Sequence, residues 1–204
     1  MKKSPFLLEQ QSLVKSVESW YNIAESLVDE VNKDEALYCC TQAIAANPLY
    51  YKAYALAGYI SSNLGKKKQA IKYYDIALSI NPNDAIVYNN KGNALSDLGK
   101  KKQAIKYYDI ALSINPNDAI VYYNKGKALS DLGKAYEALE YFNQASKLLK
   151  SGHGVEELKT KDLETVVASM QELILENRVA NDDLEKELVG NIGELQHSDS
   201  KYMS

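Results

Sequence analysis

The amino-acid sequence predicts an all-α fold built from repeated pairs of antiparallel helices, and three observations lead to this prediction. Only four of the 204 residues are proline and ten are glycine, a shortage that favours helix. Residues 65–88 are identical, letter for letter, to residues 99–122, an offset of 34 residues. Small, aromatic and proline residues also recur at fixed positions in four successive segments of this length.

These four segments, called units here, are residues 17–50, 51–84, 85–118 and 119–152. Positions 20 and 27 are alanine in every unit, and small residues at such positions let antiparallel helices approach closely. Unit one has Ala24 at position 8 and Cys40 at position 24. In the other units position 8 is glycine and position 24 is a large aromatic residue, namely Gly58 with Tyr74, Gly92 with Tyr108, and Gly126 with Phe142.

Proline and glycine residues mark the expected ends of the helices. Asn-Pro at positions 31 and 32 ends the second helix in units one to three, because proline disfavours helical backbone in the residue before it. Unit four has Lys150 in place of the proline. The glycines at position 15 end the first helix of units two to four, and they are Gly65, Gly99 and Gly133. Unit one has Val31 there, so a different turn is expected.

The period of 34 residues and the residue types at positions 4, 8, 11, 20, 24, 27 and 32 resemble the tetratricopeptide-repeat family over about two thirds of the chain. The resemblance implies a right-handed α-solenoid with a concave inner face that binds extended or helical peptides. A single helix pair cannot bury its apolar face alone, so stability is expected to come from stacking.

In the family, the first helix of each unit lines the concave groove. Carried over position by position, this implies the peptide-binding residues Tyr59, Ile86, Asn89, Asn90, Asn93, Ile120, Tyr123, Asn124 and Lys127. The chaperone-binding carboxylate clamp of the family is not expected, because only Asn90 matches its pattern.

An asparagine ladder is the second binding mode that the resemblance suggests. Asn22, Asn90 and Asn124 stand at position 6, where a carboxamide both donates to and accepts from a peptide backbone, and Leu56 interrupts the series. The alternative is that these asparagines are ordinary consensus residues in contact with water.

Charge is unevenly distributed along the chain, whose net charge is −3. Residues 51–150 hold 15 lysines and 8 acidic residues, whereas residues 151–204 hold 5 basic and 12 acidic residues. The lysine runs 66–68 and 100–102 form either a basic ridge for an acidic partner or, as we favour, solvated turns. Nucleic-acid binding is a minor alternative, because the aromatic residues occupy packing positions and do not interleave with these runs.

The C-terminal segment, residues 153–195, carries an amphipathic helical pattern, with Leu163, Val166, Met170, Leu173, Asn177, Ala180 and Leu184 at spacings of three and four. The default expectation is a capping helix or helical hairpin over the last unit. A coiled-coil homodimer with Asn177 in its seam and an acidic tail that occludes the groove are the alternatives. Residues 1–16 are expected to form a leader, and residues 196–204 a disordered tail.

No catalytic constellation is visible in the sequence. His153 and His197 lie in a linker and a tail, and the adjacent Cys39 and Cys40 are expected to be free thiols. Asp75 and Asp109 recur with the repeat and are interpreted as surface residues. No apolar run approaches the ~20 residues that span a bilayer, so no membrane span and a cytoplasmic location are expected.

The sequence therefore predicts a protein–protein interaction adaptor or scaffold that is not an enzyme. It is expected to bind a peptide segment of a protein partner, with an acidic partner as one option. No cofactor, metal or small-molecule substrate is expected. The alternative is a structural or self-associating protein that dimerises through its C-terminal helices.

Overall fold

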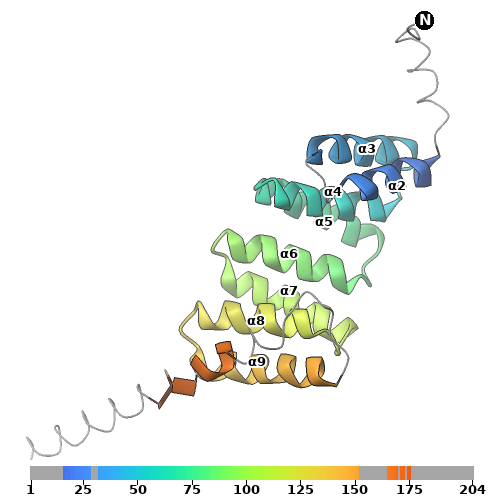
Figure 1. Cartoon of the computed structure of the whole chain (residues 1–204). Coiled ribbons are helices and arrows are strands. Elements are labelled where there is room, and N and C mark those ends of the chain that lie inside the picture. The colour runs from blue at the N-terminus through green and yellow to red at the C-terminus, as the bar shows by residue number, and fades with distance from the viewer. Residues whose placement is uncertain (1–15, 29–31, 152–164, 170, 173, 176–204) are drawn as a thin grey trace, which may run out of the picture.

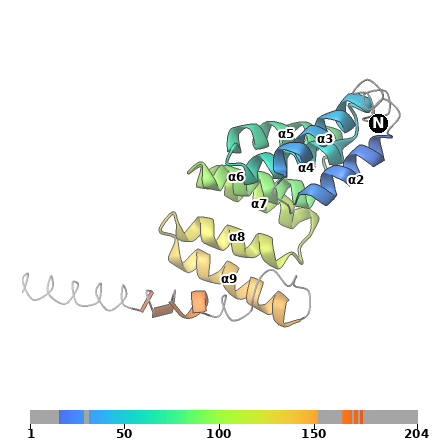
Figure 2. The ribbon, with the colours of Figure 1, turned by 45° about the horizontal axis from the view of Figure 1, so that its top comes forward.

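The computed structural model describes residues 16–28, 32–151, 165–169, 171–172 and 174–175, and within these ranges the chain is helical, with no strand. The all-α prediction is therefore confirmed. The helices form four consecutive pairs along one axis (Figures 1 and 2). They are α2 (Val17–Leu27) with α3 (Lys33–Ala46), α4 (Tyr51–Asn63) with α5 (Lys67–Ile80), α6 (Ala85–Asp97) with α7 (Lys101–Ile114), and α8 (Ala119–Ser130) with α9 (Ala135–Lys150).

The way the pairs stack determines which face is concave. Each second helix packs against the first helix of the next pair as well as against its own partner. The first helices of successive pairs also contact one another, whereas among the described helices the second helices of successive pairs do not. A stack that is close on one side and splayed on the other bends toward the close side. The concave face is therefore formed by α2, α4, α6 and α8, and the outer face by α3, α5, α7 and α9.

Contact between a glycine and an aromatic ring sets the spacing of the last three pairs. A Cβ atom built on Gly58 would lie 2.5 Å from Cε1 of Tyr74, and one on Gly92 would lie 2.5 Å from Cε1 of Tyr108. The corresponding distance from Gly126 to the ring of Phe142 is 2.8 Å. All three rings are buried, so only glycine leaves room for them at this helix spacing.

The first pair solves the same packing problem with different residues. Ala24 stands where the other units have glycine, and Cys40 stands where they have the aromatic ring, and both are completely buried. A larger residue on α2 is thus matched by a smaller one on α3. Burial raises the pKa of the Cys40 thiol from 9.0 to about 12, and the neighbouring Cys39 contributes to the rise. Both cysteines are free thiols, as expected.

The glycines expected to end the first helices do so with left-handed backbone. Gly65 has φ = +76°, and Gly99 and Gly133 have φ = +75°, values that other residues adopt only with strain. At the end of α4, the Gly65 N–H donates to Ser62 O and the Lys66 N–H donates to Ser61 O, which satisfies carbonyls that the helix leaves unpaired. Val31, where a different turn was expected, lies outside the described residues.

A buried lysine links each of the later pairs to the one before it. Lys91 in α6 forms an ion pair with Asp75 in α5 at 2.5 Å and donates a hydrogen bond to Tyr107 Oη in α7 at 2.8 Å. Burial alone would lower the pKa of Lys91, but the hydrogen bonds and charge of Asp75 and Tyr107 outweigh it, so the net shift is upward. Lys91 therefore stays charged at neutral pH and holds α5, α6 and α7 together.

The next unit repeats this arrangement with Lys125, which bridges Asp109 in α7 and Tyr141 in α9. Asp75 and Asp109 are about half exposed, in agreement with their interpretation as surface residues. Their additional role is to neutralise a buried lysine from the following pair.

The described part of the C-terminal segment covers the end of the stack. Val166 and Val167 pack against the core cluster of the last pair, which contains Leu129, Phe142 and Ala145. This placement is the one expected of a capping helix. Leu163 and the residues of the predicted stripe from Met170 onward lie outside the described residues, as do most of the leader and the whole predicted tail. No described helix combines the length and the apolar character needed to cross a bilayer.

The glycine–ring contact predicts that one substitution changes the free energy of unfolding in opposite directions in two sequence backgrounds. Gly92→Ala is expected to lower the free energy of unfolding by about 1–3 kcal/mol, because the new methyl group overlaps the Tyr108 ring. In a Tyr108→Cys background, which copies the first pair, the same substitution is expected to raise it, since alanine is the better helix former by about 1 kcal/mol. Urea unfolding of the four proteins measures both effects. A loss of equal size in both backgrounds would show that the ring does not require the glycine.

The raised pKa of Cys40 predicts a specific loss of stability in mild alkali. The unfolded thiol titrates near 9, whereas the folded thiol titrates near 12. Cys40 therefore adds stability that is fully present below pH 9 and is lost as the pH rises toward 12. The free energy of unfolding, measured at intervals from pH 7.5 to 10, is expected to begin falling near pH 9. In Cys40→Ala the fall should begin later, near pH 10, because burial also raises the folded pKa of Tyr21, Tyr74 and Tyr108 above their ordinary value of 10. Superimposable pH profiles for the two proteins would contradict the assignment.

Candidate ligand-binding groove

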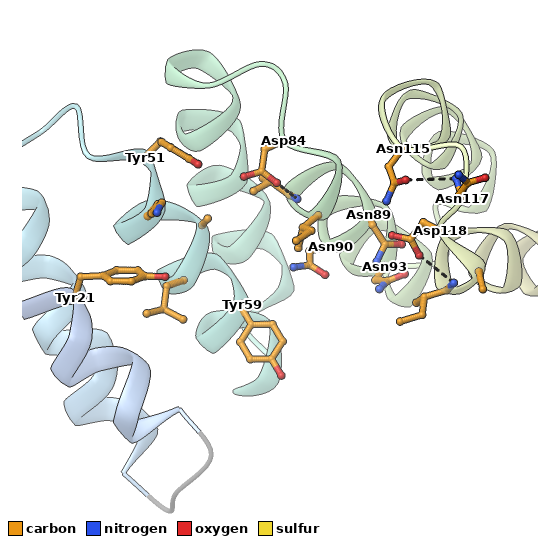
Figure 3. A pocket seen from close by; sticks show the side chains of 17 residues that line it. Tyr21, Tyr51, Tyr59, Asp84, Asn89, Asn90, Asn93, Asn115, Asn117 and Asp118 are labelled. Carbon is orange, nitrogen blue, oxygen red and sulfur yellow. Dashed lines mark hydrogen bonds between the residues drawn. The ribbon is translucent and has the colours of Figure 1, made fainter. Parts of the chain in front are cut away.

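The concave face contains a hollow of about 910 Å³ (Figure 3). Its walls come from α2, α4, α6 and the start of α8, together with the turns that precede α6 and α8. Seventeen residues line it, and Figure 3 shows their side chains converging from successive units. The groove thus spans parts of all four pairs, so it exists only because the pairs are stacked.

Six of the nine sequence-predicted site residues line this hollow, and three do not. Those that do are Tyr59, Ile86, Asn89, Asn90, Asn93 and Ile120. Tyr123 instead packs its ring against Phe142, with centroids 5.6 Å apart. Asn124 is turned toward Asn89, and Lys127 is exposed outside the hollow. Among the described residues, the fourth unit therefore contributes only Ala119 and Ile120, and the turn before them belongs to unit three.

Apolar surface is exposed within the groove on α4 and α6. Ile86 is 69% exposed and Tyr59 is 40% exposed, which is high for large apolar side chains in a folded domain. Tyr21 on α2 forms the far wall, where its ring meets the ring of Tyr50 edge-on at 5.6 Å. Burial and the charge of Glu25, which accepts a hydrogen bond from the Tyr21 hydroxyl, together raise the pKa of Tyr21 to about 12.

The asparagines of α6 are not equivalent. Asn89 is nearly buried and its Oδ1 accepts a hydrogen bond from Asn124 Nδ2 at 3.0 Å. Asn93 Oδ1 accepts a hydrogen bond from the buried Tyr108 hydroxyl at 2.8 Å. Asn90 forms no hydrogen bond with any described residue. The polar groups that remain open to a ligand are therefore the whole Asn90 carboxamide and the amide N–H groups of Asn89 and Asn93.

Sequence reasoning missed the acidic rim of the groove. Asp84 and Asp118 line the hollow and also cap helices: Asp84 Oδ1 accepts from Val87 N at 3.1 Å, and Asp118 Oδ1 accepts from Ile120 N at 3.0 Å. Each aspartate follows an Asn-Pro-Asn turn, and aspartate directly before a helix is a strong N-cap signal. The signal was therefore present in the sequence. The only lysine in this lining is Lys52.

The middle lysines of the two lysine runs are not free to form a basic ridge. Lys67 is paired with Asp97 at 2.5 Å, and Lys101 is paired with Asp131. The two aspartates lie at the ends of α6 and α8, so each pair bridges successive units. Lys67 and Lys101 also donate hydrogen bonds of 3.1 Å to Ser62 and Ser96. These lysines hold units together, whereas they were expected to be solvated.

Within the described part of the chain, no group of three or more His, Cys, Asp or Glu side chains is placed to hold a metal ion. Both histidines, His153 and His197, lie outside the described residues. The chemistry that the groove offers is hydrogen bonding by carboxamides beside exposed aromatic and aliphatic surface.

Comparison with protein families gives three matches, each described as tetratricopeptide repeat. They cover residues 51–84, 85–118 and 107–140. No curated protein matches the chain.

Solved structures of MamA proteins share the fold. A crystal structure of MamA superimposes with a TM-score of 0.63 at 23% identity, over 67% of this chain and 80% of that one. A second, MamA MSR-1, has a TM-score of 0.59 at 25% identity, over 68% of this chain and 79% of that one. The structure of residues 41 to the end of MamA from Desulfovibrio magneticus RS-1 has a TM-score of 0.62 at 19% identity, over 80% of this chain and 96% of that one. These likenesses show the fold. The three family matches over residues 51–140, together with the 34-residue helix pairs, show that the chain belongs to the tetratricopeptide-repeat family.

Proposed function

We propose that the protein is an interaction adaptor that binds a peptide segment of a partner in the concave groove. The observation that carries this proposal is that Asn90, whose carboxamide has no hydrogen-bond partner among the described residues, lines the same hollow as the exposed side chains of Tyr59 and Ile86. Desolvating apolar surface supplies binding energy, and the carboxamide supplies hydrogen bonds to a peptide backbone. This combination supports binding and requires no catalytic group.

The charges in the groove bear on the kind of peptide that fits. Lys52 is accompanied by the carboxylates of Asp84 and Asp118, whose charge is partly satisfied by the helix N-termini that they cap. A strongly acidic peptide would gain one cation and face two carboxylates. The groove therefore suits a peptide with apolar side chains and little net charge. An acidic partner is better served by a different surface.

Asn90 and Asn124 occupy the same position in successive units, yet they should differ in their effect on folding. Asn124→Ala is expected to lower the free energy of unfolding by about 1 kcal/mol, because the nearly buried Asn89 loses its hydrogen-bond donor. Asn90→Ala should leave stability within about 0.5 kcal/mol, since no described hydrogen bond is lost. Urea unfolding of the two variants tests this, and equal losses would show that Asn90 is bonded internally.

Because Asn90→Ala should not disturb folding, it is the variant of choice for testing the groove. Full-length protein, Tyr59→Ala/Asn90→Ala and the outer-face control Tyr136→Ala would be used to capture partners, with quantitative mass spectrometry as the readout. A groove ligand should be retained by wild type and by the control, and reduced at least about tenfold by the groove variant.

A peptide from the captured partner would then be titrated against the same three proteins. Equal affinity for wild type and for Tyr59→Ala/Asn90→Ala would remove the groove from the mechanism. Dimerisation through the C-terminal helices, the alternative from the sequence, remains a prediction.

A further inference from the structure

On the outer face, α5 and α7 carry four exposed lysines that form no ion pair with any described residue. Lys68 and Lys72 lie on α5, Lys102 and Lys106 lie on α7, and all four are exposed. The lysines around them are paired: Lys67 with Asp97, Lys91 with Asp75, Lys101 with Asp131 and Lys125 with Asp109. No ion pair involves the first four among the described residues. The aspartates near these helices are already paired with other lysines, so a basic surface remains.

This basic surface also exposes apolar side chains, and the same residues occur on both helices. Ile76 and Ile110, one turn beyond the lysines on each helix, are 40% and 38% exposed. On α5 a hollow of about 560 Å³ is lined by Lys68, Gln69, Lys72, Tyr73 and Ile76. Residues 65–88 and 99–122 are identical, so α7 presents the same side chains in the same order. The basic outer face, defined by these residues of α5 and α7, is therefore a tandem of two equal surfaces.

A segment of complementary character is present in the same chain. Residues 171–195 contain seven acidic and two basic residues, a net charge of −5, beside the apolar positions Leu173, Ala180 and Leu184. Val166 and Val167 are anchored on the last pair, but Leu175 is 60% exposed and Glu172 is also exposed. Glu172 and Leu175 are therefore exposed just before the most acidic part of the chain.

We propose that residues 171–195 of one copy dock on the basic outer face of a second copy. As a helix, the form that its apolar spacing predicts, the segment would be about 37 Å long at 1.5 Å per residue. Packed helices lie about 8–10 Å apart, and α5 and α7 each pack against α6. Their axes are therefore at most about 20 Å apart, and this length suffices to cross both. Acidic side chains would meet the four lysines, and apolar ones would cover Ile76 and Ile110.

The donor segment and the receiving face are different parts of the molecule. Such a contact is heterologous, so every copy can give one segment and receive another, and assembly need not stop at a dimer. This proposal uses the outer face and does not depend on the groove being a peptide site.

The first test is the mass in solution, measured by sedimentation velocity on the full-length chain. The mass is expected to rise with concentration above the 22.8 kDa of one chain. It should return toward that value in about 1 M salt, where screening acts beyond ~3 Å. A single chain at every concentration would overturn the proposal, including the case in which the segment folds back on its own stack.

Two full-length variants make the test specific. The face variant replaces Lys68, Lys72, Lys102 and Lys106 with Gln. The segment variant carries Glu172→Gln, Glu176→Gln, Asp182→Asn and Asp183→Asn. Each alone should associate about ten- to a hundredfold more weakly than wild type, since exposed ion pairs contribute little singly but add over four. Mixed together they should form a one-to-one complex, because one retains the segment and the other retains the face.

A matched control replaces four other lysines with Gln, namely Lys33, Lys52, Lys127 and Lys147. It changes the net charge equally and should associate like wild type. If the control loses association and the face variant keeps it, the segment occupies a surface other than α5 and α7 and the proposal is wrong. Failure of the two variants to complement each other would also overturn it. Neither result would alter the capture of a groove ligand by the Tyr136→Ala variant. The proposal of a peptide-binding groove and the proposal of segment docking can therefore fail separately.

Discussion

The fold depends on the close contact between the first helix of a pair and an aromatic ring on the second. With Gly92 under Tyr108, the helices approach so closely that a single methyl group would collide with the ring. This distance sets where the turn at Gly99 must fall and how far α6 can reach toward α8. The first helices of neighbouring pairs contact one another, whereas the described second helices of neighbouring pairs do not. The concave groove is the accumulated result of these short distances.

The first pair shows that the constraint concerns volume and not residue identity. Ala24 and Cys40 together satisfy the condition that glycine and an aromatic ring satisfy elsewhere, and both remain fully buried. In the second pair, Ser61 stands where the third and fourth have the buried Leu95 and Leu129. Its hydroxyl is buried without a hydrogen-bond partner among the described residues, which is costly. The second pair thus carries a cost of polar burial that the third and fourth pairs avoid with leucine.

Features that repeat in the sequence could be predicted, and features that depend on a partner from another helix could not. The all-α fold and the turn glycines follow from spacing alone. The difference in hydrogen bonding between Asn90 and Asn124 does not follow from spacing, because it depends on Asn89. Asn89 lies one unit before Asn124, and its equivalent in the next unit is Tyr123. Lys91 looks like a surface residue in the sequence, and only the packing shows that it bridges Asp75 and Tyr107. The capping aspartates, by contrast, carried a recognisable local signal.

The buried lysines have a consequence for how the array can change its length. Lys91 and Lys125 hold equivalent positions, as do Asp75 and Asp109, and Tyr107 and Tyr141. If one 34-residue unit were lost, Asp75 would meet Lys125 in the arrangement that it now makes with Lys91. If one unit were gained, the same ion pair between a lysine and the aspartate of the preceding unit would form once more. The repeated part is therefore modular, and the concave face can lengthen or shorten by whole helices, changing the length of ligand that it spans without a new interface having to evolve.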